Sequence, residues 1–369
     1  MANRTYISDA DTARRLAGLG NSPAREDLVY FLASRDATVT DALYREADRA
    51  RRQWVGDEIH LRAIIEFSNH CRRDCRYCGI RRGFPGVTRY RMTVSEVIDA
   101  AAAAVAMGYR TVVLQSGEDG WFTGDRICRM VEGIKGLGDI AVTLAVGERP
   151  AAEYRAFFDA GADRYLLKHE TADPELYAGL NPGMTLEARV DCLRELKAIG
   201  FQTGSGIMIG LPGQTLESLA DDILLFRELD LDMIGCGPYI PVAGCPTGWS
   251  AADREELSFR VLALNRLVTR DTHLPSTTAL STLNENDARA LALTRGANVI
   301  MPNLTPERFR RFYEIYPSKK RIEVDNLAFR TELEALAARL GRGISLGRGD
   351  RPGWPVRSEV DKQYGERPI

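Results

Sequence analysis

The chain has 369 residues, of which 44% are hydrophobic and 27% charged, with a formal net charge of −2 and seven cysteines. This composition is that of a globular protein with a full core; it argues against a nucleic-acid partner and against a small disulfide scaffold. No apolar run approaches the roughly 20 residues of a membrane span, and the first twenty residues lack the apolar core of a secretion signal, so we expect a cytoplasmic protein without membrane contact.

Helices are predicted for the first sixty residues, where "PAREDLVYFLASR" and "TVTDALYREADRARRQWVG" are amphipathic at helical spacing. From there on, short apolar runs alternate with helix-like stretches. The strand candidates begin near Leu61, Arg110, Ile140, Arg164, Phe201, Leu231, Leu274 and Ala297.

Each strand candidate lies a helix length from the next, which is typical of parallel βαβ units. We therefore predict a complete (β/α)8 barrel over residues 61–317, close to the usual length of about 250 residues; an open doubly wound sheet is the alternative. An N-terminal helical extension (1–60) precedes the barrel, and a C-terminal helix and tail (318–369) follow it. After residue 340 the tail is rich in Gly, Pro and Arg, and we expect it to wrap the surface or to be partly disordered.

Polar or unusual residues follow most of the predicted strands, where the active sites of such barrels lie. We expect all of them to face one mouth: the cysteine cluster 71–78, Ser116 to Asp119, Gly147 to Arg149, Lys168 to Thr171, Gly210 to Thr215, Ser276 to Thr278 and Met301 to Asn303.

Three of the seven cysteines, Cys71, Cys75 and Cys78, lie within eight residues, with no fourth nearby. An iron–sulfur cube normally takes four thiolates, so three leave one iron open to an exogenous ligand such as S-adenosylmethionine (SAM). The alternatives are a structural zinc site with His70 as fourth ligand, although adjacent residues rarely both reach one tetrahedral ion, and free structural thiols.

The C-x3-C-x2-C spacing with Tyr77 before its last cysteine resembles the radical SAM superfamily. More narrowly, "IIEFSNHCRRDCRYCGIRR", "RYRMT", "VVLQSGED", "GADRYLLKHETADP", "GLPGQT", "GPYIP" and "GANVIMPN" are similar to the HydE family of [FeFe]-hydrogenase maturases. The resemblance runs in order from about residue 60 to 317.

The resemblance implies one [4Fe–4S] cluster on Cys71, Cys75 and Cys78, with SAM beside it. The SAM contacts that it implies are Tyr77 near the adenine, Ser116, Gly117 and Glu118 near the methionine amino group, and Glu170 and Arg189 as further polar contacts. From the residues alone, Arg189 is as often a surface salt-bridge partner.

For the substrate cavity, the resemblance implies Thr143, Thr277, Thr278 and Met301, with Tyr313 and Tyr316 as an aromatic lid and Lys168 where we associate an arginine with the family. Packing of a helix is the alternative for either tyrosine. His169 is more often a core histidine than a catalyst, and "GLPGQT" is a turn without the lysine of a phosphate loop.

The remaining cysteines are not part of the family pattern. Residues 318–345 contain none, so we expect no auxiliary cluster. Cys128, Cys192 and Cys236 are predicted to be small core residues, whereas Cys245 is expected to be exposed.

The sequence therefore predicts a radical SAM enzyme of the HydE type that generates a 5′-deoxyadenosyl radical in a closed barrel. Its implied substrate is a small organometallic iron species, and its implied partners are other maturases and an electron donor. The alternatives are an enzyme that acts on an amino acid, as methylornithine synthase does, a sulfur inserter related to biotin synthase, and a non-catalytic cluster carrier. A sulfur inserter needs a second cluster, for which we find no cysteine set.

Overall fold

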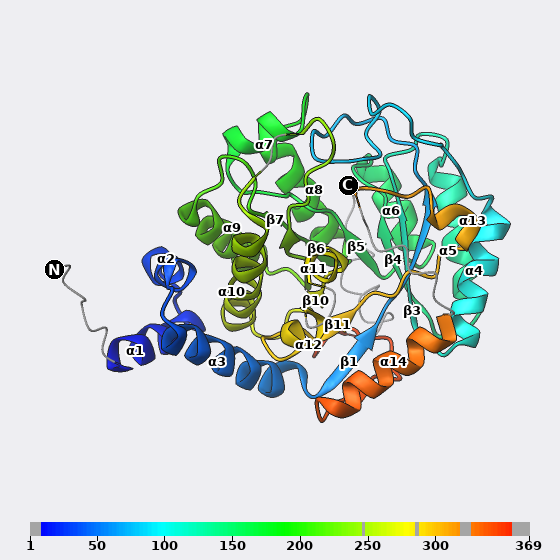
Figure 1. Ribbon diagram of the computed structural model, residues 1–369. Helices are drawn as coiled ribbons and strands as arrows, with labels where there is room; N and C mark the ends of the chain where they lie inside the picture. Colours follow the sequence, from blue (N-terminus) through cyan, green and yellow to red (C-terminus); the bar gives the residue numbers. More distant parts are fainter. Residues whose placement is uncertain (1–8, 246–247, 285–287, 318–325, 356–369) are drawn as a thin grey trace.

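A six-stranded parallel sheet forms the larger part of the core (Figure 1). The computed structural model describes residues 9–245, 248–284, 288–317 and 326–355. The strands follow in chain order as β2 (Ala63–Ser68), β3 (Thr111–Ser116), β4 (Ala141–Ala145), β5 (Arg164–Leu166), β6 (Gln202–Ser205) and β8 (Met233–Ile234). All six residues of β2 are buried, as expected for a parallel strand covered on both faces.

A second sheet contains β10 (Pro275–Ser276), β11 (Val299–Ile300), β1 (Glu58–Leu61) and β12 (Gly343–Ile344). Two single parallel bridges, Met233 to His273 and Ile64 to Asn303, join it to the two ends of the first sheet. A short pair of β7 (Met208–Ile209) and β9 (Gly237–Pro238) extends β6 and β8 toward the mouth. The predicted parallel α/β pattern is confirmed, with strands at all eight expected places.

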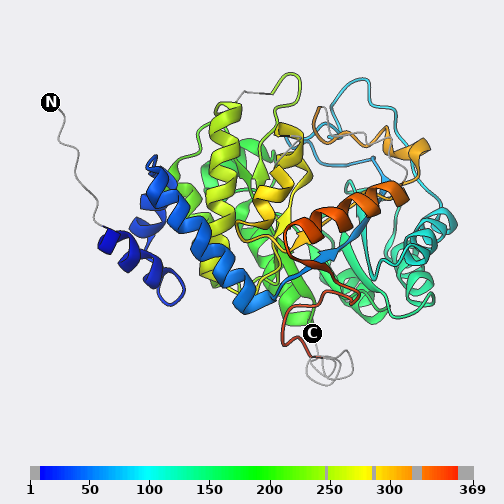
Figure 2. The ribbon, with the colours of Figure 1, turned by 60° about the horizontal axis from the view of Figure 1, so that its bottom comes forward.

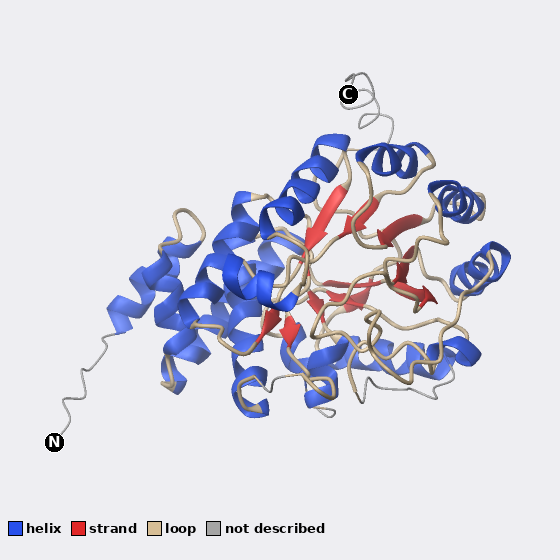
Figure 3. Ribbon diagram, turned by 90° about the horizontal axis from the view of Figure 1, so that it is seen from above, coloured by secondary structure: helices blue, strands red, loops and turns tan. Residues whose placement is uncertain are grey.

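Helices lie outside the strands (Figure 3). They are α4 (Val94–Ala106), α5 (Gly124–Lys135), α6 (Ala151–Asp159), α7 (Pro174–Leu180), α8 (Leu186–Ile199), α9 (Leu216–Glu228), α10 (Ala251–Thr269), α11 (Thr278–Leu283), α12 (Ala288–Leu293), α13 (Glu307–Arg310) and α14 (Asn326–Arg339). Local sequence fixes where several begin: Thr93 and Glu96 form a capping box at α4. On α5, Ile127, Val131 and Ile134 recur at helical spacing and are fully buried.

Three N-terminal helices, α1 (Asp9–Leu19), α2 (Arg25–Ala33) and α3 (Ala37–Val55), lie on one side of the strands against α9 and α10 (Figure 1). Arg260 of α10 donates to the carbonyl of Leu32 at 2.8 Å, and Tyr44 of α3 donates to Glu256 at 3.1 Å. None of the described residues of this extension lines the pocket at the carboxyl ends of the strands.

The C-terminal segment packs beneath the amino ends of the strands (Figure 2, dark red). β12 pairs with β1, and Arg348 donates to Asp163 at 2.6 Å. Asp350 accepts from Arg164 at 2.5 Å, at the first residue of β5. Residues 343–351 are therefore bound to the strands through specific ion pairs, while residues 356–369 of the expected tail lie outside the described residues.

Removal of the Arg351 side chain is expected to destabilise the fold. Its guanidinium lies 2.9 Å from Asp232, whose side chain is fully buried, and 2.8 Å from Asp271. Arg351→Ala leaves the Asp232 carboxylate without its closest cation, so we expect the free energy of unfolding to fall by about 2–4 kcal/mol. Urea denaturation measures this, with Arg14→Ala on the exposed face of α1 as the control. Equal stability of the two variants would contradict the role of the tail.

Candidate functional site

A cavity of about 380 Å³ opens at the carboxyl ends of the strands, beneath the loop that follows β2. Its volume is in the range of pockets that enclose a small molecule. The structure brings all of the predicted site residues to its wall: Cys71, Cys75, Tyr77, Cys78, Ser116, Gly117, Glu118, Thr143, Lys168, Glu170, Arg189, Thr277, Thr278, Met301, Tyr313 and Tyr316. None of the residues of the turn 210–215 lines this cavity.

Cys71, Cys75 and Cys78 lie on the loop between β2 and α4, and all three thiols are free. A turn closed by the Cys78 amide and the Cys75 carbonyl (3.1 Å) folds the loop back on itself, and the Arg73 amide donates to the Cys71 sulfur at 3.4 Å. Burial raises the pKa of Cys75 to about 11 and that of Cys78 to about 12. Burial also raises the pKa of the Cys71 thiol, and iron would bind all three as thiolates.

The cysteine loop is held rigidly to its surroundings. The Asn69 side chain donates to the carbonyls of Thr88 and Phe312, both at 2.8 Å, and the Gly79 amide donates to the Ile315 carbonyl at 2.8 Å. A Cβ built on Gly117 would lie 2.2 Å from the carbonyl oxygen of His70. The loop after β3 therefore lies directly against the first cysteine, and only a glycine fits there.

An ionic network joins the cysteine loop to three other elements. Glu118 accepts from Arg73 at 2.6 Å and from Arg72 at 3.0 Å. Arg73 also donates to Glu148 at 2.6 Å, and Glu148 accepts from Arg189 of α8 at 2.8 Å. The Glu118 carboxylate is therefore occupied by arginines, which favours a positioning role for it over direct contact with a ligand.

Arg189 is buried at the cavity wall rather than exposed on its helix. It is 9% exposed, and it donates to the Lys168 carbonyl at 2.7 Å in addition to Glu148. Burial opposes its charge, but Tyr177 and Glu148 raise the pKa of Arg189 above its ordinary value. Its guanidinium is thus a fixed positive charge at the cavity wall.

Glu170 has an unusual backbone and an unsatisfied side chain. Its φ of 67° is in the left-handed region, which is uncommon for a residue other than glycine. Backbone bonds hold it there, because its amide donates to Gly206 at 2.9 Å and its carbonyl accepts from Met208 at 3.1 Å. Its Oε2 atom is buried and has no hydrogen-bond partner among the described residues, so the carboxylate can accept from a bound ligand.

His169, adjacent to Glu170, is fully buried and does not line the cavity. Its Nδ1 lies 2.8 Å from the Ser205 hydroxyl, and its Nε2 lies 3.6 Å from Asp222. Burial raises the pKa of Asp222. These contacts agree with the core-histidine alternative and fix the backbone that presents Lys168 and Glu170 on either side.

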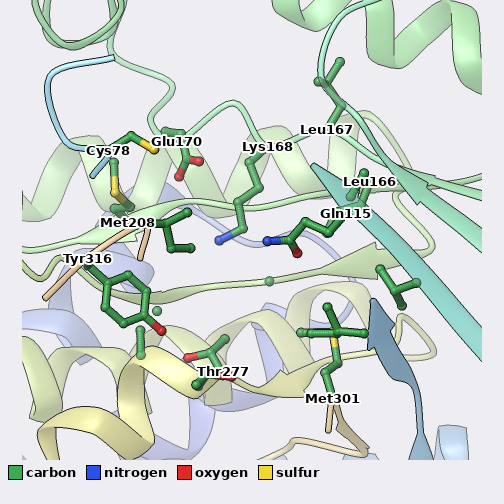
Figure 4. Close-up of a pocket in the computed structure, with 18 of the residues that line it drawn as sticks. Cys78, Gln115, Leu166, Leu167, Lys168, Glu170, Met208, Thr277, Met301 and Tyr316 are labelled. Atoms are coloured by element: carbon green, nitrogen blue, oxygen red, sulfur yellow. The ribbon is translucent and has the colours of Figure 1, made fainter. Parts of the chain in front are cut away.

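Lys168 and Gln115 reach toward one another inside the cavity (Figure 4). Gly206 leaves room for the lysine, since a Cβ built there would lie 3.1 Å from its Cε. Gln115 donates to the Tyr313 hydroxyl at 3.4 Å. The Lys168 amine therefore lies in the cavity next to the side-chain amide of Gln115.

Hydroxyl and sulfur groups form another part of the cavity wall. The Thr143 hydroxyl is buried without a partner among the described residues. Thr277 faces the same space as Tyr316 and Met301 (Figure 4). Tyr313 is 2% exposed and Tyr316 is half-buried. A polar ligand would meet hydrogen-bonding groups on one side and soft apolar groups on the other.

Eight further polar or sulfur-bearing side chains line the cavity and are not among the predicted site residues: Arg62, Glu66, Arg73, Gln115, Met208, Met233, Tyr239 and His273. Gln115 could have been found, because it precedes "SGED" on the same strand. Arg62 could not, because nothing local distinguishes it; its guanidinium is buried at the amino end of β2 and donates to Met233 at 2.8 Å.

The zinc alternative gains no support from the arrangement of the side chains. Within the described ranges, no group of three or more His, Cys, Asp and Glu side chains is arranged to hold a metal ion. A cube of four irons uses a separate iron for each thiolate and so accommodates ligands that are farther apart.

The other cysteines are distributed as follows. Cys236 is buried, Cys128 and Cys192 are half-buried against the core, and Cys245 is half-buried rather than exposed, with its sulfur beside the Arg76 carbonyl. None of the helices in the described part of the chain is both long and apolar enough to cross a membrane.

Comparisons with known proteins agree with this geometry. The family model of the radical SAM superfamily matches residues 65–226. The chain is 47% identical over 295 residues to the [FeFe] hydrogenase maturase subunit HydE of Thermotoga maritima, covering 80% of this chain and 84% of the relative. It is 26% identical to 3-methylornithine synthase of Methanosarcina barkeri, over 76% of this chain and 79% of that protein.

Among solved structures, methylornithine synthase has a TM-score of 0.78 at 22% identity, covering 90% of this chain and 97% of that one. The maturase HydG from Carboxydothermus hydrogenoformans has a TM-score of 0.73 at 18% identity, covering 91% and 80%. At these identities, the two structures support the fold alone.

Proposed function

The chain belongs to the HydE family within the radical SAM superfamily, and we propose that it acts in the assembly of the diiron cofactor of [FeFe]-hydrogenase. It is a radical SAM enzyme, which cleaves SAM reductively. The observation that carries the proposal is that the cysteine loop, the unpartnered carboxylate of Glu170 and the amine of Lys168 border one cavity.

Cys71, Cys75 and Cys78 would hold one [4Fe–4S] cluster. When bound, the cluster supplies the electron that breaks a sulfonium C–S bond of SAM and so yields the 5′-deoxyadenosyl radical. Free, half-buried thiols on a rigid loop suit this role, and free cysteines suit a reducing cytoplasm.

The polar side chains on the part of the cavity wall next to the cysteine loop would bind and orient SAM. The Glu170 carboxylate would accept from the ribose hydroxyls, and the Arg189 guanidinium would pair with the methionine carboxylate. Tyr77, Ser116 and Gly117 would complete this wall. Glu118 would not contact SAM itself; it would hold Arg73, and with it the cysteine loop, in place.

Residues 61–317 would form a complete (β/α)8 barrel between the N-terminal extension and the C-terminal segment. Support comes from the parallel bridges of Met233 with His273 and of Ile64 with Asn303, which lie where the two sheets meet. A closed barrel under a lid of Tyr313 and Tyr316 would exclude water from the radical.

The substrate would be a small organometallic iron species, delivered by another maturase. Lys168, Thr143, Thr277 and Thr278 offer positive charge and hydroxyls to an anionic ligand, and Met301 offers an apolar, polarisable contact. Lysine carries its charge at one point and lacks the two-pronged geometry of arginine, so it suits a single acceptor atom.

Loss of the Glu170 carboxylate is expected to weaken SAM binding. Glu170→Gln keeps the shape of the side chain but removes a charged acceptor, so the affinity should fall about tenfold. Binding of SAM to cluster-loaded protein by calorimetry measures this. Glu175→Gln, an exposed residue five positions along the chain, should change the affinity less than about twofold; an equal loss in both variants would contradict the assignment.

Complementation tests the biological role. The chain is expressed in a strain that has an [FeFe]-hydrogenase but lacks its own HydE-type maturase, and hydrogenase activity is measured. We expect activity to return with the native chain and not with the Cys75→Ala variant. No recovery, together with formation of 3-methylornithine by the purified protein, would replace this proposal by the amino-acid alternative.

A further inference from the structure

The turn that presents Glu170 to the cavity spans only three residues. The Thr171 amide donates to the His169 carbonyl at 2.8 Å, across Glu170. With a φ of 67° at its central residue, this γ-turn is of the rarer and more strained kind. Such a backbone persists only where the surrounding structure holds it in place.

Asp222 of α9 contacts both ends of this γ-turn. Its Oδ1 atom accepts from the amide of Ala172, which follows the turn, and lies 3.6 Å from Nε2 of His169, which begins it. The side chains of Asp222 and His169 are both fully buried. The Oδ2 atom of Asp222 has no hydrogen-bond partner among the described residues, so the contacts with the turn are made through Oδ1.

The hydrogen bonds of Ser205 indicate where the protons of His169 lie. The Ser205 hydroxyl has one hydrogen and donates it to the Leu167 carbonyl at 2.9 Å. Both groups are satisfied if Nδ1 of His169, 2.8 Å away, donates to the Ser205 oxygen. Nε2 then faces Asp222, and that contact is attractive only when one of the two groups carries a proton between them. Burial raises the pKa of Asp222, which favours a proton in this contact.

An amide cannot replace the Asp222 carboxyl group here, because one oxygen serves both Ala172 and His169. An asparagine oxygen would keep the bond to Ala172 but would bring neither a proton nor a charge to Nε2. A turned asparagine would offer its N–H group to Nε2 and would leave the Ala172 amide without its acceptor. In either orientation, one end of the γ-turn is released.

Asp222 can influence a bound ligand only through this turn. Neither Asp222 nor His169 lines the cavity, whereas Glu170 does, and Oε2 of Glu170 has no partner among the described residues. An acceptor that is already fixed in its binding position loses little conformational freedom when a ligand arrives. The rigidity of the turn therefore contributes to the affinity for whatever Glu170 binds.

We propose that Asp222 is a positioning residue of the SAM site: through Ala172 and His169 it holds the γ-turn that directs the Glu170 carboxylate toward the ribose hydroxyls. The inference rests on the proposed function. If Asp222 served only the packing of the core, its replacement would affect SAM binding equally with and without the Glu170 side chain. A positioning role predicts that the effect of Asp222 on binding requires that side chain.

A double-mutant cycle separates these two roles. Asp222→Asn, Glu170→Ala and the combined variant are prepared as full-length, cluster-loaded proteins. Their iron content is checked, and their affinity for SAM is measured by calorimetry. We expect Asp222→Asn to lower the affinity about fivefold in the native background, but less than about twofold in the Glu170→Ala background.

Asp221→Asn is the matched control, because it makes the same chemical change at the adjacent position of α9. The Asp221 side chain is 43% exposed and pairs with Arg25 of α2. This variant should change the affinity for SAM by less than about twofold, as expected for an exposed ion pair.

The inference is wrong if Asp222→Asn leaves the affinity unchanged, if its effect is the same with and without the Glu170 side chain, or if Asp221→Asn has the same effect. Should Asp222→Asn not hold a cluster, His169→Asn repeats the cycle, because its amide can donate to Ser205 while the contact with Asp222 is lost. Failure of both variants to hold a cluster would also overturn the inference, since Asp222 would then support the fold as a whole. The proposed function fails separately, if dithionite-reduced native protein does not cleave SAM.

Discussion

Replacement of Cys75 by alanine is expected to remove the iron centre and with it all radical chemistry. Cys75 is the middle residue of the three thiols at the cavity wall, and no other cysteine in the described part of the chain lines that cavity. The variant would keep only two of the three predicted cluster thiolates. Its iron content should therefore fall from about four atoms per chain to less than about one. Anaerobic reconstitution followed by iron and sulfide analysis measures this.

The matched control is Cys128→Ala, a half-buried cysteine on α5 that packs against the core. It should reconstitute with the same iron content as the native protein. Full iron in the Cys75→Ala variant would mean that the cluster has other ligands, and loss of iron in both variants would point to a general folding defect.

Gly117→Ala is expected to damage the same site without touching a ligand. A Cβ at this position would lie 2.2 Å from the His70 carbonyl oxygen and 2.8 Å from the Cys71 Cβ. Both neighbours belong to a loop that hydrogen bonds hold on several sides, so the loop cannot move away without cost. We expect the free energy of unfolding to fall by about 1–3 kcal/mol and iron incorporation to fall by at least half.

Gly120→Ala is the control in the same loop, because no atom lies within 4 Å of a Cβ built there. It should keep the iron content and change stability by less than about 0.5 kcal/mol. If the two alanine variants behave alike, the close contact between the loop after β3 and the first cysteine is not what positions the cluster.

The parts of the fold and site that could be predicted are those encoded over short stretches of sequence. The cysteine spacing, the "SGED" motif and the alternation of strands and helices are local, and each lies where it was expected. The same holds for Glu170, which is next to a strand end; its backbone strain and its unpartnered carboxylate became visible only in three dimensions.

Long-range pairings could not be predicted. Arg73 and Arg189 both donate to Glu148, from which they are 75 and 41 residues away in the sequence. Nothing in the sequence around either arginine distinguishes it from an ordinary surface charge. For the same reason the sequence alone leaves Arg189 open as a surface residue, although it is buried. The composition of the C-terminal segment predicts a tail that wraps the surface or is partly disordered, yet Arg348 and Arg351 form ion pairs with the buried aspartates Asp163 and Asp232.

The most direct test of the central claim is the cleavage of SAM. The native protein is reconstituted anaerobically with iron and sulfide, reduced with dithionite and mixed with SAM, and 5′-deoxyadenosine is quantified by chromatography. The account predicts 5′-deoxyadenosine from the native protein and none above background from the Cys75→Ala variant. The absence of 5′-deoxyadenosine from native protein whose cluster is fully assembled and reduced would contradict it.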